Sequence, residues 1–245
     1  MSNFIVALVL GLWSGFAMVM ALSGIGIRNA LVMGVVAGLV VGDPGKGLEV
    51  GATCTLMLMG FYTYGGATIP DFVTGAIFGT VVAARTNDVN AGLAVAAALG
   101  LLMTQMDILG RATTTVFQHL GDAALAKNSI KTFEMWTLAG TLPWLLSRAL
   151  PVFLGLLFID NIVAFTDFAT SIEKVQIGLT VVGRSLPAVG FALLLSFMNV
   201  KKFWPFMVIG FVLYAFTRQP MTIIGLALVG AALGALFIGD KGGAK

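Results

Sequence analysis

One short stretch of the chain, residues 51–71, combines polar side chains with helix-breaking residues inside an otherwise apolar sequence. It reads GATCTLMLMGFYTYGGATIPD and contains four threonines, two tyrosines, a pair of adjacent glycines and a proline followed by an aspartate. Hydroxyl groups both donate and accept hydrogen bonds, as the binding of a hydroxyl-rich ligand such as a sugar requires. Because a plain membrane-spanning helix needs none of these residues, the stretch is a candidate binding segment.

The chemistry of this stretch rests on three residue types. Threonine hydroxyls supply hydrogen bonds, glycines let the backbone approach a ligand closely, and a carboxylate accepts hydrogen bonds from two sugar hydroxyls. The predicted substrate-binding residues are Thr53, Thr55, Thr63, Gly65, Gly66 and Asp71. Two structural interpretations stay open beside this one. The threonines can bond to the carbonyl of the preceding turn, and Asp71 can cap the helix that follows Pro70.

The composition indicates the environment in which this stretch lies. The chain has 245 residues, of which 58% are hydrophobic and 10% are charged, whereas soluble domains carry roughly 25% charged residues. We therefore predict an all-α integral membrane protein. The net charge of +3 is scattered and gives no basic stripe for nucleic acid. With one histidine and one cysteine, the sequence predicts no metal site, disulfide or cofactor.

The hydrophobic pattern predicts a polytopic chain. A hydrocarbon core about 30 Å thick requires about 20 apolar residues per spanning helix, and several segments here are shorter. We predict roughly nine or ten membrane segments, including short, broken or re-entrant helices. Residues 1–245 then form a single membrane domain without a soluble domain. The predicted segments are 4–23, 30–42, 51–71, 72–84, 91–106, an amphipathic helix over 108–134, two segments over 135–165 broken near Arg148 and Pro151, and 175–198, 203–217 and 220–238.

The region around residues 111–131 holds three cations and one acid, and the positive-inside rule places this loop in the cytoplasm. Its single histidine lies on the predicted amphipathic helix, and nothing around it resembles a phosphate cradle or a nucleophile with its base. The histidine is either an ordinary interfacial residue or a contact for a partner protein. The predicted partner contacts are Arg111, His119, Lys127 and Lys131.

Four segments of the chain carry a family resemblance. They are GDPGKGLEVGATCTLMLMGFYTYGGATIPD at 42–71, FQHLGDAA at 117–124, GLTVVGRSLPAVGFALLLSFM at 178–198 and PFMVIGF at 205–211. In this order they resemble the IIC component of mannose-type sugar phosphotransferase systems, a family that handles mannose, fructose, sorbose and N-acetylgalactosamine. The matches extend over nearly the whole chain.

The resemblance implies a multi-pass sugar-translocating subunit of the bacterial inner membrane. Such a subunit pairs with a second membrane subunit, IID, in a higher oligomer. A hexose or amino sugar crosses and is phosphorylated by the soluble IIB protein, which IIA recharges. This chain is then a transport subunit and not itself the enzyme that carries the phosphoryl group.

The sequence departs from the family pattern at several positions. Thr55 replaces a common glutamate, Thr63 a common asparagine, Asn29 and Ala30 an Arg-Pro pair, and Arg184 follows Gly183 where a small residue is common. Either the sugar differs from mannose, or the partner chain supplies a missing carboxylate. Arg184 is a candidate contact for an anionic sugar or a charge at a helix end. The candidate substrate or gating residues are Asn29, Asp43, Glu49 and Arg184.

A stand-alone ion-coupled secondary transporter is the alternative function. It requires titratable groups within the membrane, and the acids here cluster at predicted segment ends, with only Asp71 and Glu49 placed to face a cavity. An intramembrane enzyme is a third alternative. It lacks a paired nucleophile and base or a metal cluster.

Overall fold

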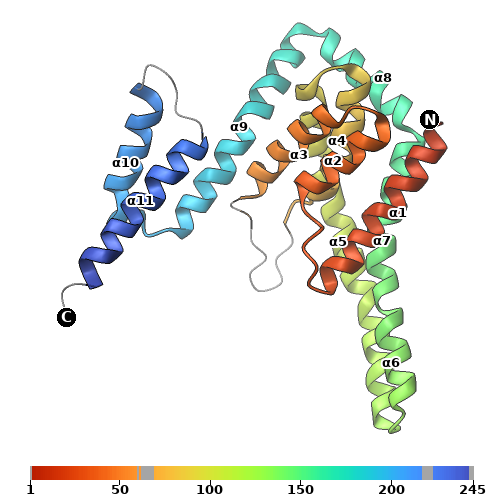
Figure 1. Cartoon of the computed structure of the whole chain (residues 1–245). Helices are drawn as coiled ribbons and strands as arrows, with labels where there is room; N and C mark the ends of the chain where they lie inside the picture. The colour runs from red at the N-terminus through yellow and green to blue at the C-terminus, as the bar shows by residue number, and fades with distance from the viewer. Residues whose placement is uncertain (1, 60, 62–68, 217–222, 243–245) are drawn as a thin grey trace. The chain divides into compact units, whose positions relative to one another are not determined.

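The computed structural model describes residues 2–59, 61, 69–216 and 223–242. Every regular element in this part of the chain is a helix, which confirms the predicted all-α class (Figure 1). The helices are α1 (Asn3–Leu22), α2 (Ala30–Val41), α3 (Pro44–Leu58), α4 (Phe72–Thr86), α5 (Val89–Ala126), α6 (Ile130–Ala139), α7 (Thr141–Leu157), α8 (Ile159–Ser171), α9 (Glu173–Phe197), α10 (Val200–Phe216) and α11 (Ile223–Gly242). The chain forms two compact units, Met1–Leu194 and Leu195–Lys245. The second unit contains α10 and α11, which pack against each other.

Side-chain caps define the short helices of the first unit. Asn29 accepts a hydrogen bond from the Val32 N–H at 2.8 Å and begins α2. Asp43 accepts one from the Lys46 N–H at 3.1 Å and begins α3, where Pro44 occupies the first turn. Proline suits this position because its fixed φ is helical and the first-turn N–H groups have no helical partner. Helix α3 ends at Leu58 and α4 begins at Phe72, with Asp71 as its cap, so the predicted interruption of residues 51–71 is confirmed.

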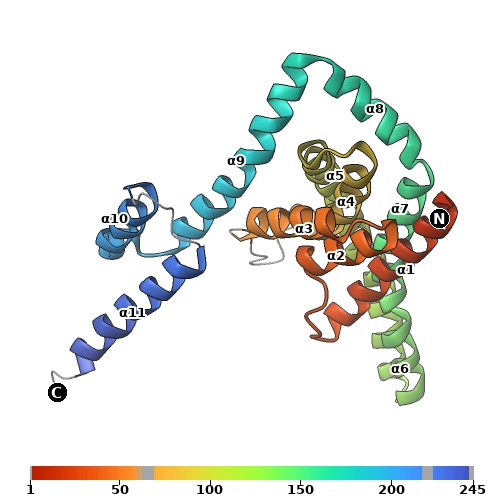
Figure 2. The ribbon, with the colours of Figure 1, turned by 45° about the horizontal axis from the view of Figure 1, so that its top comes forward.

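Helices α2, α3 and α4 are too short to span a bilayer, and they pack against one another, with α4 mostly buried and α2 and α3 buried on one face. Each has 12 to 15 residues, which gives a length of about 18–22 Å. Ala37, Val50 and Val81, one from each helix, are completely buried. Figure 2 shows these helices beside one another, with α1 running along α7. Buried placement of short helices is how a membrane protein keeps free backbone ends away from lipid.

Two of the predicted helix boundaries are wrong. Helix α5 continues for 38 residues through position 107, where we expected a break between segments 91–106 and 108–134. The predicted loop at 111–131 is therefore helix up to Ala126, followed by a turn at 127–129 in which Asn128 has a positive φ of 52°. Helix α7 likewise continues through Arg148 and Pro151. Charged residues do not end these helices because the charges pair across the helix interface, and a single proline removes only one backbone hydrogen bond.

The α5–α7 hairpin is longer than the bilayer is thick. At 1.5 Å per residue, the 38 residues of α5 rise about 57 Å, against a hydrocarbon core of about 30 Å. Within the described residues, three helical stretches are long and apolar enough to span a membrane: Asn3–Leu22, Val89–Ala126 and Ile130–Leu157. The total number of spans stays a prediction.

Helix α2 packs on α3 with backbones in direct contact. A Cβ atom added at Gly51 would lie 2.8 Å from the carbonyl oxygen of Ala30 and 3.0 Å from the Leu31 Cα. We therefore expect Gly51→Ala to lower the free energy of unfolding by about 1–3 kcal/mol, because only a backbone shift can relieve the overlap. Gly45→Ala in the same helix is the matched control, since its Cβ would meet only the Asp43 Oδ1, at 3.6 Å. Thermal unfolding of both variants tests this, and equal melting temperatures would contradict it.

Candidate functional site

A polar cavity of about 280 Å³ lies where the segment after α1, the start of α4, the middle of α5 and α7 meet. Its volume is near the lower limit for small-molecule pockets. The stretch singled out in the sequence borders it through Leu58, Ile69, Pro70 and Asp71. Five charged side chains line it, and we refer to them as the charged cluster: Arg28, Asp71, Asp107, Arg111 and Arg148.

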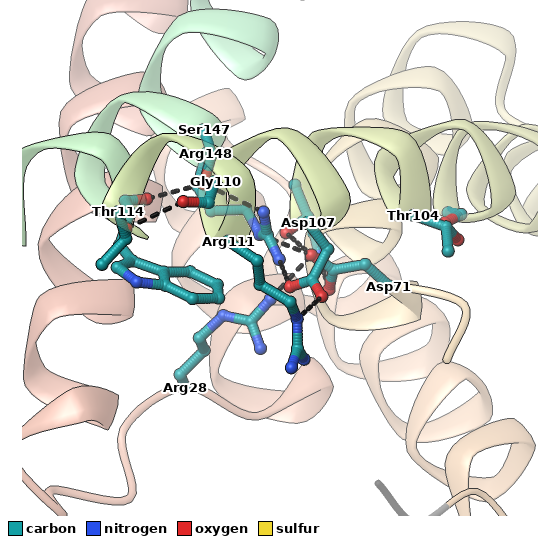
Figure 3. Close-up of polar contacts among 12 residues, drawn as sticks. Arg28, Asp71, Thr104, Asp107, Gly110, Arg111, Thr114, Ser147 and Arg148 are labelled. Atoms are coloured by element: carbon teal, nitrogen blue, oxygen red, sulfur yellow. Dashed lines mark hydrogen bonds and ion pairs between the residues drawn. The ribbon is translucent and has the colours of Figure 1, made fainter. Parts of the chain in front are cut away.

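Asp71 is buried and bonded on all sides (Figure 3). Its Oδ1 accepts a hydrogen bond from the Thr74 N–H at 3.1 Å, which begins α4. Its Oδ2 accepts from the Thr74 hydroxyl at 2.8 Å and from Arg28 Nη2 at 2.7 Å. The capping interpretation of Asp71 is confirmed. A direct contact between Asp71 and a sugar stays a prediction.

Arg148 is the largest fully buried side chain of the described residues, with 2% of its side chain exposed. Its Nη2 donates to Asp107 Oδ1 at 2.7 Å and its Nη1 to the Ser147 hydroxyl at 3.0 Å. Its Nε lies 2.8 Å from Asp71 Oδ2 as an ion pair, but the Nε–H forms no hydrogen bond with the described residues. One guanidinium on α7 therefore joins the carboxylates of α4 and α5.

Arg111 completes the charged cluster one turn along α5. Its Nε donates to Asp107 Oδ2 at 2.8 Å, and its guanidinium lies 5.8 Å above the centre of the Trp144 ring. Its side chain is 42% exposed, and that of Arg28 is 18% exposed. The two accessible guanidiniums thus flank buried Arg148 and Asp71 and the half-buried Asp107.

The remaining residues of the opening stretch have local roles or lie outside the described chain. The hydroxyls of Thr53 and Thr55 donate to the carbonyls of Glu49 and Gly51, both at 2.8 Å. The interpretation of these threonines as bonded to the preceding turn is confirmed, and neither lines the charged cavity. Their contact with a sugar stays a prediction. Thr63, Gly65 and Gly66 lie outside the described residues, as does the side chain of Arg184 in α9.

The other candidate residues are dispersed. Asn29 and Asp43 cap α2 and α3, and Glu49 is exposed on α3. The side chain and backbone N–H of Lys46 hold the pKa of the Asp43 carboxyl below its ordinary value. The partner-contact candidates other than Arg111 are exposed. Lys127 and Lys131 lie around the α5–α6 turn, and His119 lies on α5. Their contact with a partner is not tested by the single chain.

Sequence reasoning missed Arg28, Asp107 and Arg148 as members of a site. The signal was present, because a charge inside an apolar segment is costly and usually has a function or a partner. The sequence pattern instead predicts segment ends at Asp107 and Arg148, and the structure shows both inside continuous helices. A larger cavity of about 580 Å³ lies between α5 and α8, but among its lining residues only Asn161 and Thr166 have polar side chains. The charged cavity is therefore the better candidate for a polar ligand.

A helical membrane chain with a charged cavity where helix ends meet two longer helices has the features of a transport protein. Comparison with known families identifies which one. Residues 4–236 match the model of the sorbose-specific IIC component of phosphotransferase systems. The chain therefore belongs to this family, the mannose- and sorbose-type IIC membrane subunits of sugar phosphotransferase systems, as the sequence motifs predicted.

Curated relatives agree with this assignment. The chain is 28% identical over 237 residues to the mannose-specific EIIC component of Escherichia coli K12, which covers 96% of this chain and 86% of the relative. It is 28% identical to the fructose permease IIC component of Bacillus subtilis, over 86% of this chain and 77% of the relative. It is 26% identical to the sorbose-specific EIIC component of Lacticaseibacillus casei, over 83% and 73%.

Two solved structures share the fold. A chain described only as a membrane protein superposes with a TM-score of 0.82 at 23% identity, covering 96% of this chain and 94% of that one. A chain of the mannose transporter ManYZ, solved in complex with microcin E492, superposes with a TM-score of 0.60 at the same identity and coverage.

Proposed function

We propose that this chain is the sugar-translocating subunit of a phosphoenolpyruvate-dependent phosphotransferase system in the bacterial inner membrane. It passes a hexose or amino sugar across the membrane, and a soluble IIB protein phosphorylates the sugar. Its partners are a IID membrane subunit, with which it forms a higher oligomer, and the IIB and IIA phosphocarriers. The observation that carries this proposal is a charged, ligand-sized cavity bordered by Leu58 and by residues 69–71.

Features of the first unit support a role in translocation. The cavity lies where the ends of several chain segments converge, the arrangement by which broken helices offer polar groups to a substrate within the membrane. The exposed apolar side chains of the α5–α6 hairpin suit lipid or a partner subunit, and they include Val116, Leu120, Ile130 and Leu138. The cations at 127 and 131 and His119 form the proposed contact with the soluble partner.

The alternative, an ion-coupled transporter that works alone, finds little support in the charged cluster. A proton relay requires a carboxylate that takes up and releases a proton. Asp71 and Asp107 are each already paired with two guanidiniums, so neither carboxylate is free to pass a proton along a relay. In the proposed function, phosphorylation of the sugar by the partner proteins therefore supplies the energy for transport.

Uptake by cells that lack their own sugar systems tests the proposal. We expect labelled sugar to accumulate, as its phosphate, only when this chain is produced together with a IID subunit and the IIB and IIA proteins. A panel of hexoses, amino sugars and disaccharides identifies the substrate. Accumulation of unmodified sugar by the isolated chain in liposomes, driven by a proton or sodium gradient, would contradict the proposal and favour the alternative.

A further inference from the structure

The charges around the cavity do not balance. The charged cluster contains three guanidiniums and two carboxylates, so it carries one net positive charge. We propose that this site recognises an anionic group on the transported sugar, a carboxylate or a sulfate, held by Arg28 and Arg111. The inference rests on the proposed function and adds the substrate class to it.

The carboxylates of the cluster are saturated, whereas the guanidiniums are not. Both oxygens of Asp71 and both oxygens of Asp107 accept hydrogen bonds from protein donors. Each guanidinium has five N–H groups in a planar fork, but Arg28 uses Nη2 and Arg111 uses Nε in the hydrogen bonds of the described chain. The cavity therefore offers spare donors and a positive charge, which a ligand with oxyanion acceptors satisfies.

The three arginines differ in burial, which distinguishes the structural arginine from the two that face the ligand. Arg148 is buried and its partners are the two carboxylates and Ser147. Arg28 and Arg111 are partly exposed, and Figure 3 shows their free ends extending together away from the carboxylates. The Trp144 ring beneath Arg111 holds that fork by a cation–π contact. The two forks can thus be approached by a ligand without breaking the ion pairs behind them.

A neutral sugar would leave this charge uncompensated. A buried or half-buried ion is costly unless an opposite charge accompanies it. A carboxylate or sulfate on the sugar supplies that charge and takes two parallel hydrogen bonds from an arginine fork, a geometry that gives specificity as well as affinity. A lipid phosphate has the same charge, and seven of the twelve residues lining this cavity are apolar, so the experiment below includes an anionic-lipid arm.

Equilibrium binding to the purified complex of this chain with its IID subunit in nanodiscs tests the inference. The probes are matched pairs: glucose and glucuronate, N-acetylglucosamine and its 6-sulfate, and a neutral disaccharide and its uronate-containing counterpart. We expect at least one anionic member to bind about tenfold or more tightly than its neutral partner, the range expected for a charge-assisted hydrogen bond. In the Arg111→Gln and Arg28→Gln variants, the anionic and neutral members of each pair should bind with nearly equal affinity.

Arg85→Gln is the matched control. Arg85 pairs with Asp160 and Asn3, at the other end of α4 and away from the cavity, so this variant should keep the preference for the anionic sugar. Circular dichroism and gel filtration of each variant verify that it is folded.

Three results would overturn the inference. The first is equal affinity, or no binding, for both members of every pair. The second is a preference for the anionic sugar that survives in both arginine variants. The third is loss of anionic-sugar binding when phosphatidylglycerol replaces phosphatidylcholine in the nanodisc, which would assign the forks to an anionic lipid headgroup. Partner-dependent uptake of neutral sugars, measured separately, would keep the proposed function in each case.

Discussion

Asp71→Asn is expected to lower the free energy of unfolding by about 3–5 kcal/mol, the effect of removing one partner from a buried ion pair. Asparagine caps a helix about as well as aspartate, so the Thr74 N–H keeps its acceptor and the start of α4 is preserved. What is lost is the negative charge shared by Arg28 and Arg148, which lie 2.7 and 2.8 Å from the Asp71 Oδ2. The charged cluster then holds three guanidiniums and one carboxylate, that of Asp107.

The chain provides a control for this variant. Asp43 also caps a short helix, but it pairs with a single cation, Lys46, in a partly exposed turn. Asp43→Asn keeps the cap and removes a partly exposed pair, so its effect on stability should be far smaller. Denaturation of both variants in detergent, followed by circular dichroism, gives the comparison. Equal losses would show that burial of the Asp71 ion pairs contributes nothing special.

The same variant separates the two roles suggested by the sequence for Asp71. If the carboxylate also touches the sugar, Asp71→Asn should weaken sugar affinity by about tenfold to a hundredfold in the protein that stays folded. If the carboxylate serves only the cap and the arginines, affinity per folded molecule stays near the wild-type value while stability falls. Measuring affinity and thermal stability on the same preparation distinguishes the two.

Local sequence predicted the features that depend on local physics. The interruption of residues 51–71 follows from Pro70 and from the aspartate that caps the next helix, and both act within one turn of the chain. The caps of α2 and α3 are equally local, although the sequence pattern assigns Asn29 and Asp43 to substrate or gating and does not predict a helix beginning at Pro44. The all-α membrane class follows from composition alone.

The charged cluster depends on distant pairing, which local sequence does not encode. A charge in an apolar segment either ends the helix or is buried with a partner, and the pattern around Arg148 is the same in both cases. Its partner carboxylates lie on α4 and α5, and Asp107 is 41 residues away in sequence. The choice between a break and a paired charge is made only when α7 packs beside those helices. For this reason the continuity of α5 and α7 and the composition of the cavity were missed together.

Arg148→Lys is expected to lower the free energy of unfolding by about 2–4 kcal/mol, although it keeps the positive charge. The arginine fork reaches Asp71 with Nε, Asp107 with Nη2 and Ser147 with Nη1 at the same time. A lysine ammonium is a single point charge on a flexible stem, and it cannot meet two carboxylates and a hydroxyl in one plane. At least one buried group then loses its partner, which costs more than the bond itself contributes.

A double-mutant cycle with Asp107→Asn assigns the loss to the fork. If the Arg148 fork and Asp107 act as one unit, the double variant should be less destabilised than the sum of the two single variants by about 0.5–3 kcal/mol. Arg111→Lys is the matched control on α5. Wild-type Arg111 binds Asp107 through one nitrogen, and its side chain is 42% exposed. A lysine can therefore replace it with a smaller loss of stability. Additive losses in the cycle, or wild-type stability and uptake in Arg148→Lys, would show that the site requires only a positive charge at this position and not the planar geometry of arginine.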